Sequence, residues 1–439
     1  MDSAWKTTAI LLPLTTALAY LVNREVPDPY LDEIFHIPQA QQYCRGEFLK
    51  WDSSITTPPG LSCNPSFLRY TNVLLSTTLL TWSITGILRH TTSRPRARDV
   101  LAISPFPLVT FFSLLYYTDV GSLTFVLVGY WAARERRYGV SALAGLASLT
   151  FRQTNIVWVA FTAATSILSE YSARPKPLLE IASPSGLVTE LVQTPWNIIT
   201  RPRRAGEIIA WYVPTIAAFG AFVIWNGGIV LGHQEMHVAT IHFPQLLYFL
   251  AFSTIIGWPV LCDEGVERVV RGTLRTGLGS RLIEHPFLLA DNRHYFFYIW
   301  RRIFRLHAIM PYALTPGYLV CGWAWLWKIG RRQDVYWIVG FVACTAAVLV
   351  PTPLVEPRYF LIPYLLLRLH CGPLPGTGRV SAEGSPSSRG SGAGRGEGRA
   401  KWAWVEIAWN AFVNAVTIGV FLAVTFEWKG WEGKMRFMW

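Results

Sequence analysis

The stretch TTAILLPLTTALAYLV, residues 7–22, contains no charged side chain. A helix needs about 20 mostly apolar residues to cross the hydrocarbon core of a bilayer. This stretch therefore predicts a first transmembrane helix. No small-residue cleavage pattern precedes Asn23, so we expect this helix to remain attached as a signal anchor.

Similar runs recur along the 439 residues, which are 51% hydrophobic and only 15% charged. That apolar content exceeds what a single soluble core holds, so the surplus must face lipid. We predict an all-α, polytopic transmembrane helical bundle of about 11–13 spans. The apolar runs that we expect to cross the membrane include 7–22, 67–88, 100–117, 120–133, 140–168, 208–229, 243–262, 307–327, 335–350, 359–370 and 402–426.

The positions of the basic residues indicate how the chain is oriented in the membrane, not that it binds nucleic acid. The net charge is +12, but the lysines and arginines are dispersed in short gaps between the runs, such as Arg89 to Arg98. By the positive-inside rule these gaps are cytosolic. The polar loop 23–66 then lies on the opposite, lumenal side. Cys44 and Cys63 share that loop and could pair in an oxidising lumen.

Three regions follow from composition. We expect residues 1–371 to form the transmembrane catalytic domain, including the lumenal loop 23–66. Residues 372–400 are rich in Gly, Ser and Arg, and such a segment has no apolar surface to bury, so we expect a disordered cytosolic linker. Residues 401–439 should form a final transmembrane helix and a lumenal tail.

Two polar features stand out in a chain that is short of charges. Asp32 and Glu33 follow the first apolar run, and an acidic pair at the membrane surface is a candidate for general-base chemistry. The alternative, ordinary surface acids in a solvated loop, fits the composition equally well. Arg152 interrupts the run 140–168, and exposing an arginine side chain to lipid has a high free-energy cost. We expect it at the lumenal rim or in a wet cavity.

Several long and unusual motifs run from the first loop to the last residue. They are PYLDEIFHIPQAQQYCRGEFLKWD at 29–52, ITTPPGL at 55–61, FRQTNIVW at 151–158, HVATIHFPQLLYF at 237–249, LLADNRHYFFYIWRR at 288–302, EPRYFLIPYLLLRL at 356–369 and RFMW at 436–439. These motifs resemble one family, the dolichyl-phosphate-glucose-dependent α-1,2-glucosyltransferases of the endoplasmic reticulum, which belong to the GT-C superfamily.

The resemblance implies a GT-C type fold in the endoplasmic reticulum membrane with a lumenal active site. It implies dolichyl phosphate glucose as the donor and a diglucosylated dolichyl-diphosphate oligosaccharide as the acceptor. We expect no cofactor, and the cysteine and histidine spacing offers no metal ligands, although the sequence leaves open whether a divalent metal assists. Because a β-linked donor gives an α-linked product, the reaction inverts the anomeric centre and needs one base but no covalent nucleophile.

The resemblance also suggests roles for individual residues. We expect Asp32 to be the general base, with Glu33 as the substitute. Arginine suits the departing phosphate because it binds phosphate oxygens bidentately. The donor-phosphate candidates are Arg358, Arg152, His242, His237 and His294, and the acceptor-binding candidates are Asp119, His36, Trp51 and Asp52.

Other functions remain open on the sequence alone. The alternatives are another GT-C transferase, such as a mannosyltransferase, a multi-pass lipid or solute transporter, and a noncatalytic scaffold. A transporter should carry ionisable residues near mid-span, whereas here they gather at one membrane face. Residues 263–286 offer no apolar run where the family has a further span. Either a segment has been lost here, or residues 265–283 re-enter the membrane; we expect a lost segment and poor packing.

Overall fold

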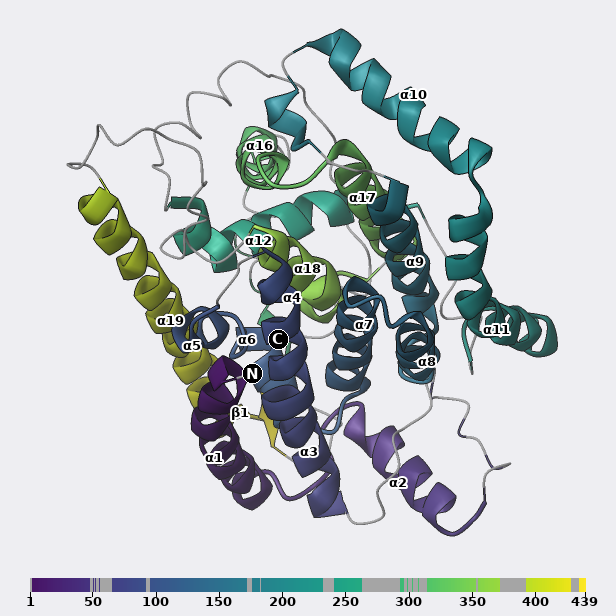
Figure 1. Cartoon of the computed structure of the whole chain (residues 1–439). Helices are drawn as coiled ribbons and strands as arrows, with labels where there is room; N and C mark the ends of the chain where they lie inside the picture. Colours follow the sequence, from purple (N-terminus) through teal and green to yellow (C-terminus); the bar gives the residue numbers. More distant parts are fainter. Residues whose placement is uncertain are drawn as a thin grey trace. The chain divides into compact units, whose positions relative to one another are not determined.

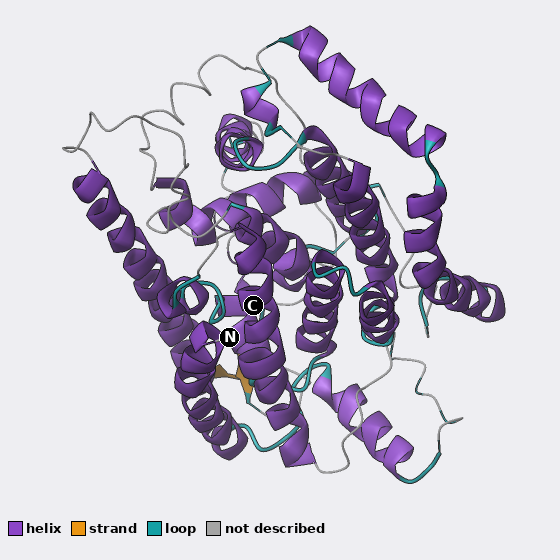
Figure 2. Ribbon diagram, viewed as in Figure 1, coloured by secondary structure: helices purple, strands orange, loops and turns teal. Residues whose placement is uncertain are grey.

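The computed structural model describes residues 2–47, 50, 52, 55, 65–91, 95–171, 176–181, 183–231, 241–262, 293–295, 298, 302, 307, 314–352, 354–371, 392–427 and 434–439. These residues are overwhelmingly helical (Figure 2), with one two-stranded antiparallel sheet of β1 (Thr425–Phe426) and β2 (Met435–Arg436). Among them, five helices are long and apolar enough to cross a membrane: 2–25, 68–91, 203–226, 244–262 and 401–423. The predicted all-α, polytopic membrane fold is confirmed.

Packing divides the chain into two compact units. The first comprises residues 1–90, 112–238 and 329–348. Its elements are α1 (Asp2–Glu25), α2 (Glu33–Cys44), α3 (Pro65–Leu74), the π-helical turn η1 (Leu75–Leu80), α4 (Thr81–Thr91), α7 (Thr118–Arg134), α8 (Tyr138–Leu149), η2 (Gln153–Asn155), α9 (Ile156–Tyr171), η3 (Leu178–Glu180), α10 (Pro184–Thr200), α11 (Arg203–Asn226) and α17 (Val335–Leu349) (Figure 1).

Helix α7 is the centre of the first unit and packs against α8, α9 and η1. Small residues allow this close packing, as is common between membrane helices. A Cβ atom at Gly121 would lie 2.2 Å from the Phe151 ring, and one at Gly86 would lie 2.2 Å from Trp131 Nε1. The glycine at position 121 therefore lets the polar interruption at 151–155 approach the start of α7.

The second unit comprises residues 91–111, 239–328 and 349–439. Its elements are α5 (Ala97–Leu101), most of α6 (Pro107–Ser113), α12 (Pro244–Cys262), α16 (Thr315–Gly330) as far as residue 328, η7 (Pro357–Phe360), α18 (Leu361–His370), α19 (Gly392–Ala423), β1 and β2. Aromatic side chains form its core, where Phe106 stacks on Tyr364 with ring centroids 4.5 Å apart and Phe252 contacts both rings edge-on.

The predicted span 100–117 is wrong as a single helix. The chain there forms α5, a turn and α6, and α7 begins at Thr118. Proline has no N–H and breaks the helical ladder, and prolines occupy positions 105 and 107. Two α19 side chains bond the carbonyl oxygens of this turn: Asn410 donates to Ala102 and Asn414 to Pro105, both at 2.9 Å. Non-helical backbone at membrane depth is tolerated where protein supplies such partners.

The second unit also buries an ion pair between α18 and α19. Arg368 Nε donates to Glu406 Oε1 at 2.8 Å and Nη2 donates to Oε2 at 2.7 Å, and both side chains are only 2% exposed.

Helix α19 begins at Gly392. The first part of the expected linker, residues 372–391, and the expected gap at 263–286 lie outside the described residues.

Candidate functional site

The acidic pair lies where the first loop turns into α2. Asp32 is the residue before the helix, and Glu33 is its first residue. The preceding Leu31 has φ of +53°, a left-handed conformation that is unfavourable for a bulky side chain. Such a backbone persists only when surrounding contacts hold it in place. The contacts of Glu33 do this.

Glu33 is fully buried and anchors the loop. Arg69 of α3 donates to it twice, from Nε to Oε1 at 2.9 Å and from Nη2 to Oε2 at 2.6 Å. The backbone N–H of Tyr30 donates to Oε2 at 3.0 Å, and that of Tyr116 donates to Oε1 at 2.6 Å. Four donors thus compensate the desolvation of this carboxylate.

Asp32 differs from its neighbour because its side chain is partly exposed and makes no capping hydrogen bond to α2. Its backbone N–H donates to the Tyr117 hydroxyl at 3.3 Å. The same Tyr117 segment is held by Asn72, whose Nδ2 donates to the carbonyl oxygens of Leu115 and Tyr117, both at 2.8 Å. The backbone of Asp32 is therefore hydrogen-bonded to a segment that Asn72 holds in place, and these bonds join the first loop to the start of α7.

Asp119 and Arg152 form an ion pair in the same unit. Arg152 Nη2 donates to Asp119 Oδ1 at 2.6 Å, and the aspartate is 2% exposed whereas the arginine is 21% exposed. Arg152 lies in the segment between α8 and α9. In the same segment, Asn155 Nδ2 donates to Ser122 Oγ of α7 at 2.8 Å. Because Asp119 lies two residues after Tyr117, the structure brings Asp32, Asp119 and Arg152 to one end of the unit.

The other candidates of the first loop lie on or near α2. His36 is one turn after Asp32, and its backbone N–H donates to the Asp32 carbonyl oxygen at 3.0 Å. The Asp52 backbone N–H donates to Gln39 Oε1 at 2.9 Å, so α2 holds that segment too. Cys44 is disulfide-bonded, whereas Cys262, Cys321, Cys344 and Cys371 are not in disulfide bonds. Trp51 and Cys63 lie outside the described residues.

The second unit holds three further candidates for phosphate binding, Arg358, His242 and His294. Arg358 in η7 pairs with Glu356 and lies over the Tyr359 ring. His242, just before α12, donates its backbone N–H to Val350 at 2.9 Å. Gln245 Nε2 then donates to the carbonyl oxygens of residues 352 and 354 at 2.9 and 2.7 Å. These bonds fasten the segment that leads to Arg358 onto the start of α12.

His294 contacts the end of the chain. Its Nδ1 lies 2.6 Å from the Trp439 carbonyl oxygen. The Tyr295 N–H donates to Met438 at 3.1 Å, and the Met438 N–H donates to Arg293 at 3.0 Å. Two separate motifs of the sequence, around 293–295 and 436–439, therefore pair through their backbones. His237 lies outside the described residues.

Sequence reasoning missed Arg69, the partner of Glu33. The signal was present, since Arg69 lies within the predicted span 67–88 and is 3% exposed. An arginine inside a membrane span marks a paired or functional group. The pairing itself was not readable, because the partner lies 36 residues earlier in the chain.

The sequence matches the DIE2/ALG10 family over residues 26–369. Relatives named Dol-P-Glc:Glc(2)Man(9)GlcNAc(2)-PP-Dol alpha-1,2-glucosyltransferase include proteins of Mus musculus, Arabidopsis thaliana and Yarrowia lipolytica. The mouse protein is 33% identical over 95% of this chain and 94% of its own length. The Arabidopsis protein is 32% identical over 96% and 97%, and the Yarrowia protein is 30% identical over 98% and 97%. No solved structure matches the chain.

The alignment with the mouse protein is longer than the matched part of this chain. It has 472 positions, whereas 95% of 439 residues is about 417, so about 55 positions of the mouse protein face a gap here. That is enough for one span of about 20 residues with its loops. We therefore still predict that this chain lacks, near residues 263–286, a segment that its relatives have. The match over 26–369 and the near full-length relatives establish that the chain belongs to the DIE2/ALG10 family.

Proposed function

We propose that this protein transfers glucose from dolichyl phosphate glucose to the terminal glucose of Glc2Man9GlcNAc2-PP-dolichol, forming an α-1,2 linkage. The observation that carries the proposal is the likeness of 30–33% identity, over nearly the whole of both chains, to enzymes named for this reaction. The membrane-spanning helices fit it, because both substrates are lipids. The chemistry needs no cofactor besides the lipid-linked donor.

Asp32 is the general base of the proposed reaction. The acceptor 2-hydroxyl attacks C1 of the donor glucose, its proton passes to the Asp32 carboxylate, and the C1–O bond to phosphate breaks with its electron pair leaving on dolichyl phosphate. One displacement inverts the centre. The partly exposed Asp32 suits proton transfer better than Glu33, whose two carboxylate oxygens accept four hydrogen bonds inside the protein.

The departing phosphate needs positive charge, which Arg358 and Arg152 supply in the proposal. A guanidinium carries five N–H donors, so a carboxylate can fix its orientation while other donors bind phosphate oxygens. Each arginine is held in this way, Arg358 by Glu356 and Arg152 by Asp119, and each remains about one-fifth exposed. His242, His294 and His237 are further candidates for the same phosphate, and His36, Trp51, Asp52 and Asp119 for the acceptor.

The active site faces the lumen of the endoplasmic reticulum in this proposal. The basic stretch 372–400, whose last nine residues belong to α19, favours a cytosolic start for this helix. In this proposal the end of α19 at Ala423 and the tail 434–439 are therefore lumenal. His294 is bonded to Trp439, so in this proposal the 293–295 segment lies on the lumenal side as well. The expected lost segment near 263–286 therefore need not move these residues into the cytosol.

The test is transfer of radiolabelled glucose from dolichyl phosphate glucose to a diglucosylated lipid-linked acceptor by the purified full-length protein. We expect Asp32→Asn to lower kcat by about 10²–10⁴-fold, the usual contribution of a general base. Asp28→Asn is the matched control, since Asp28 is an exposed acid of the same loop, and it should keep the wild-type rate. Full activity of Asp32→Asn would remove the base assignment. Transfer from dolichyl phosphate mannose instead of the glucose donor would favour the mannosyltransferase alternative.

A further inference from the structure

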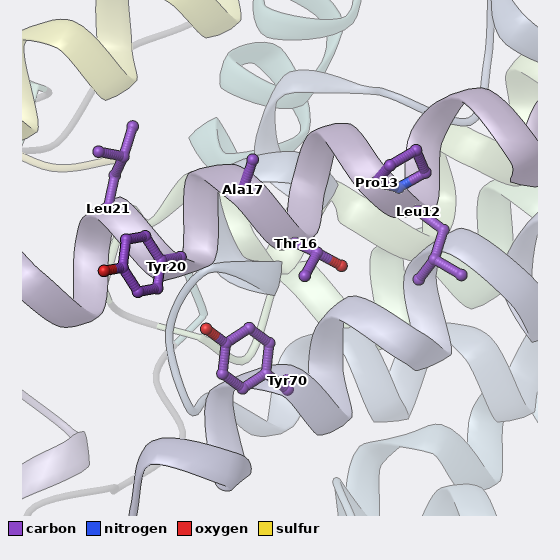
Figure 3. Close-up of a pocket in the computed structure, with 7 residues that line it drawn as sticks. All are labelled: Leu12, Pro13, Thr16, Ala17, Tyr20, Leu21 and Tyr70. Atoms are coloured by element: carbon purple, nitrogen blue, oxygen red, sulfur yellow. The ribbon is translucent and has the colours of Figure 1, made fainter.

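The hollow between α1 and α3 is an open face of the first unit (Figure 3). The described residues that line it are neutral and include Leu12, Ala17 and Tyr70. Tyr20, another lining residue, is 61% exposed, so nothing there selects one ligand. A more selective arrangement lies in the second unit, around the tail 435–439.

Arg436 fixes the start of this tail to the end of α19. Its Nη1 donates to the carbonyl oxygens of Phe421 and Leu422 at 2.8 and 2.7 Å, and the residue is 9% exposed. The last carbonyl groups of a helix lack partners within the helix, and a positive charge is favourable beside them. The position of the tail is therefore set by α19.

Trp439 lies at the other end of the tail and contacts two further elements. Its ring is edge-on to Tyr295 at 5.6 Å and edge-on to Phe252 of α12 at 6.4 Å, measured between ring centroids. Both distances fall in the range of favourable aromatic pairs. The backbone of Met438, which is 1% exposed, pairs with residues 293 and 295 at 3.0 and 3.1 Å. The tail thus connects α19, α12 and the 293–295 segment.

Phe252 also joins this cluster to the segment of Arg358. The Phe252 ring centroid lies 5.5 Å from that of Phe360, and Phe360 is the last residue of η7, two residues after Arg358. Trp439 and Phe360 therefore pack against one and the same side chain. For this reason the segments that carry His294 and Arg358 are neighbours, although they are distant in sequence.

The charges of these two segments suit an anion. Residues 293–295 and 354–360 contain three basic residues, Arg293, His294 and Arg358, and one acid, Glu356. Glu356 is already paired with Arg358. Phosphate oxygens are bound best by cations with N–H donors, so a phosphate ester fits this surplus of positive charge better than a neutral ligand.

Trp439 determines which nitrogen of His294 exchanges a proton. The Nδ1 atom lies 2.6 Å from the main-chain oxygen of Trp439. That oxygen can only accept, so Nδ1 carries the hydrogen atom and Nε2 is the atom that gains or loses a proton. When it is protonated, Nε2 donates a charge-assisted hydrogen bond of the kind that phosphate oxygens accept.

We propose that Trp439 is a positioning residue for the donor: it holds His294 beside the Arg358 segment, so that both basic side chains bind the phosphate of dolichyl phosphate glucose. The inference rests on the proposed function, which supplies this phosphate. Trp439 itself does not touch the phosphate. It acts through the orientation of His294, which its main-chain oxygen and its ring both support.

The first test compares Trp439→Ala with Trp258→Ala in the purified full-length protein. Trp258 is the matched control, because it also makes two edge-on ring contacts, with Trp402 at 5.9 Å and with Trp409 at 6.1 Å, and it lies on α12 as Phe252 does. The glucose-transfer assay gives KM for each substrate.

We expect Trp439→Ala to raise KM for the donor about tenfold, the effect of losing one hydrogen bond to a charged group. The KM for the acceptor should not change. Trp258→Ala should keep both KM values, and Trp439→Phe, which retains a ring, should have a donor KM near that of the wild type. Equal rises of the donor and acceptor KM, or the same rise in Trp258→Ala, would overturn the proposal.

His294→Ala decides whether Trp439 acts through this histidine. Alone it should raise the donor KM about tenfold. Adding Trp439→Ala should raise it no further, because two residues that act through one contact are not additive. A wild-type donor KM in His294→Ala, or effects that multiply in the double variant, would contradict the inference. If Trp439→Ala does not fold, Trp439→Leu takes its place, since leucine keeps apolar bulk but loses the ring contacts.

A binding measurement separates failure of this inference from failure of the proposed reaction. Radiolabelled dolichyl phosphate, and dolichol without the phosphate, are titrated onto the full-length protein in nanodiscs. The Kd for dolichyl phosphate should rise about tenfold in Trp439→Ala and in His294→Ala, while that for dolichol should not change. This pattern in a protein that transfers no glucose would keep the inference and reject the reaction. Glucose transfer by the wild type, with an unchanged Kd for dolichyl phosphate in both variants, would reject the inference.

Discussion

Replacing Arg69 with methionine should destabilise the protein strongly, because it leaves the buried carboxylate of Glu33 without its counter-charge. Glu33 is 0% exposed and Arg69 is 3% exposed. The change removes two of the four hydrogen bonds to that carboxylate, those from Nε at 2.9 Å and Nη2 at 2.6 Å. Breaking a buried ion pair from one side costs about 3–5 kcal/mol, a large share of a typical folding free energy.

The double variant separates the charge from the packing. Glu33→Gln alone puts an amide N–H₂ where four donors already converge, which should cost about 1–3 kcal/mol. Combined with Arg69→Met, the neutral glutamine no longer needs a counter-charge. The loss in the double variant should therefore fall below the sum of the single losses by about 1–3 kcal/mol, as for other contacting pairs.

The assay is denaturant-induced unfolding in a constant detergent, with each variant compared at its unfolding midpoint. Arg24→Met is the control: Arg24 also contacts a carboxylate, that of Glu25 at 2.9 Å, but the two side chains are 65% and 44% exposed. Exposed pairs contribute about 0–1 kcal/mol, so this variant should unfold near the wild type. A loss below about 1 kcal/mol for Arg69→Met, or strict additivity in the double variant, would refute the reasoning.

Three further outcomes follow from other contacts. Gly121→Ala should lower kcat, because the new Cβ would lie 2.2 Å from the Phe151 ring and push away the segment that carries Arg152, a proposed phosphate ligand. A wild-type kcat in the transfer assay would contradict this. Arg368→Leu should lower the denaturant midpoint of unfolding, and adding Glu406→Leu should restore most of the lost stability, because a buried apolar pair avoids the desolvation of two charges. A double variant as unstable as Arg368→Leu alone would refute this expectation. Arg358→Lys keeps the charge but loses bidentate geometry, so KM for the donor should rise about tenfold, and an unchanged KM would exclude Arg358 from phosphate binding.

Much of the architecture could be predicted from the sequence, because each segment that crosses the membrane must by itself be long and apolar enough and must satisfy its own backbone hydrogen bonds. Helix α1 covers the apolar run that predicts it, and α11 and α12 match their runs except for the last three residues and the first residue, respectively. The predicted run 140–168 is not one helix but two, α8 and α9, because the polar interruption at 151–155 separates them. The run 100–117 failed because hydropathy does not reveal that Asn410 and Asn414 accommodate a broken helix there.

Which of the two acids is buried was decided by the tertiary structure. Asp32 and Glu33 are adjacent and chemically alike, so local sequence cannot separate them. Arg69 and the Tyr116 N–H, 36 and 83 residues from Glu33, bury one acid and leave the other partly exposed.

The sequence by itself determined the membrane class, the main helices and the loop that carries the acids, because these follow from the transfer of each segment from water to lipid. Only the tertiary structure decided which charged groups are buried as pairs and which backbone segments meet, such as 293–295 with the tail at 438–439. The physical reason is that a buried charge is stable only beside a partner, and folding brings partners together from distant parts of the chain.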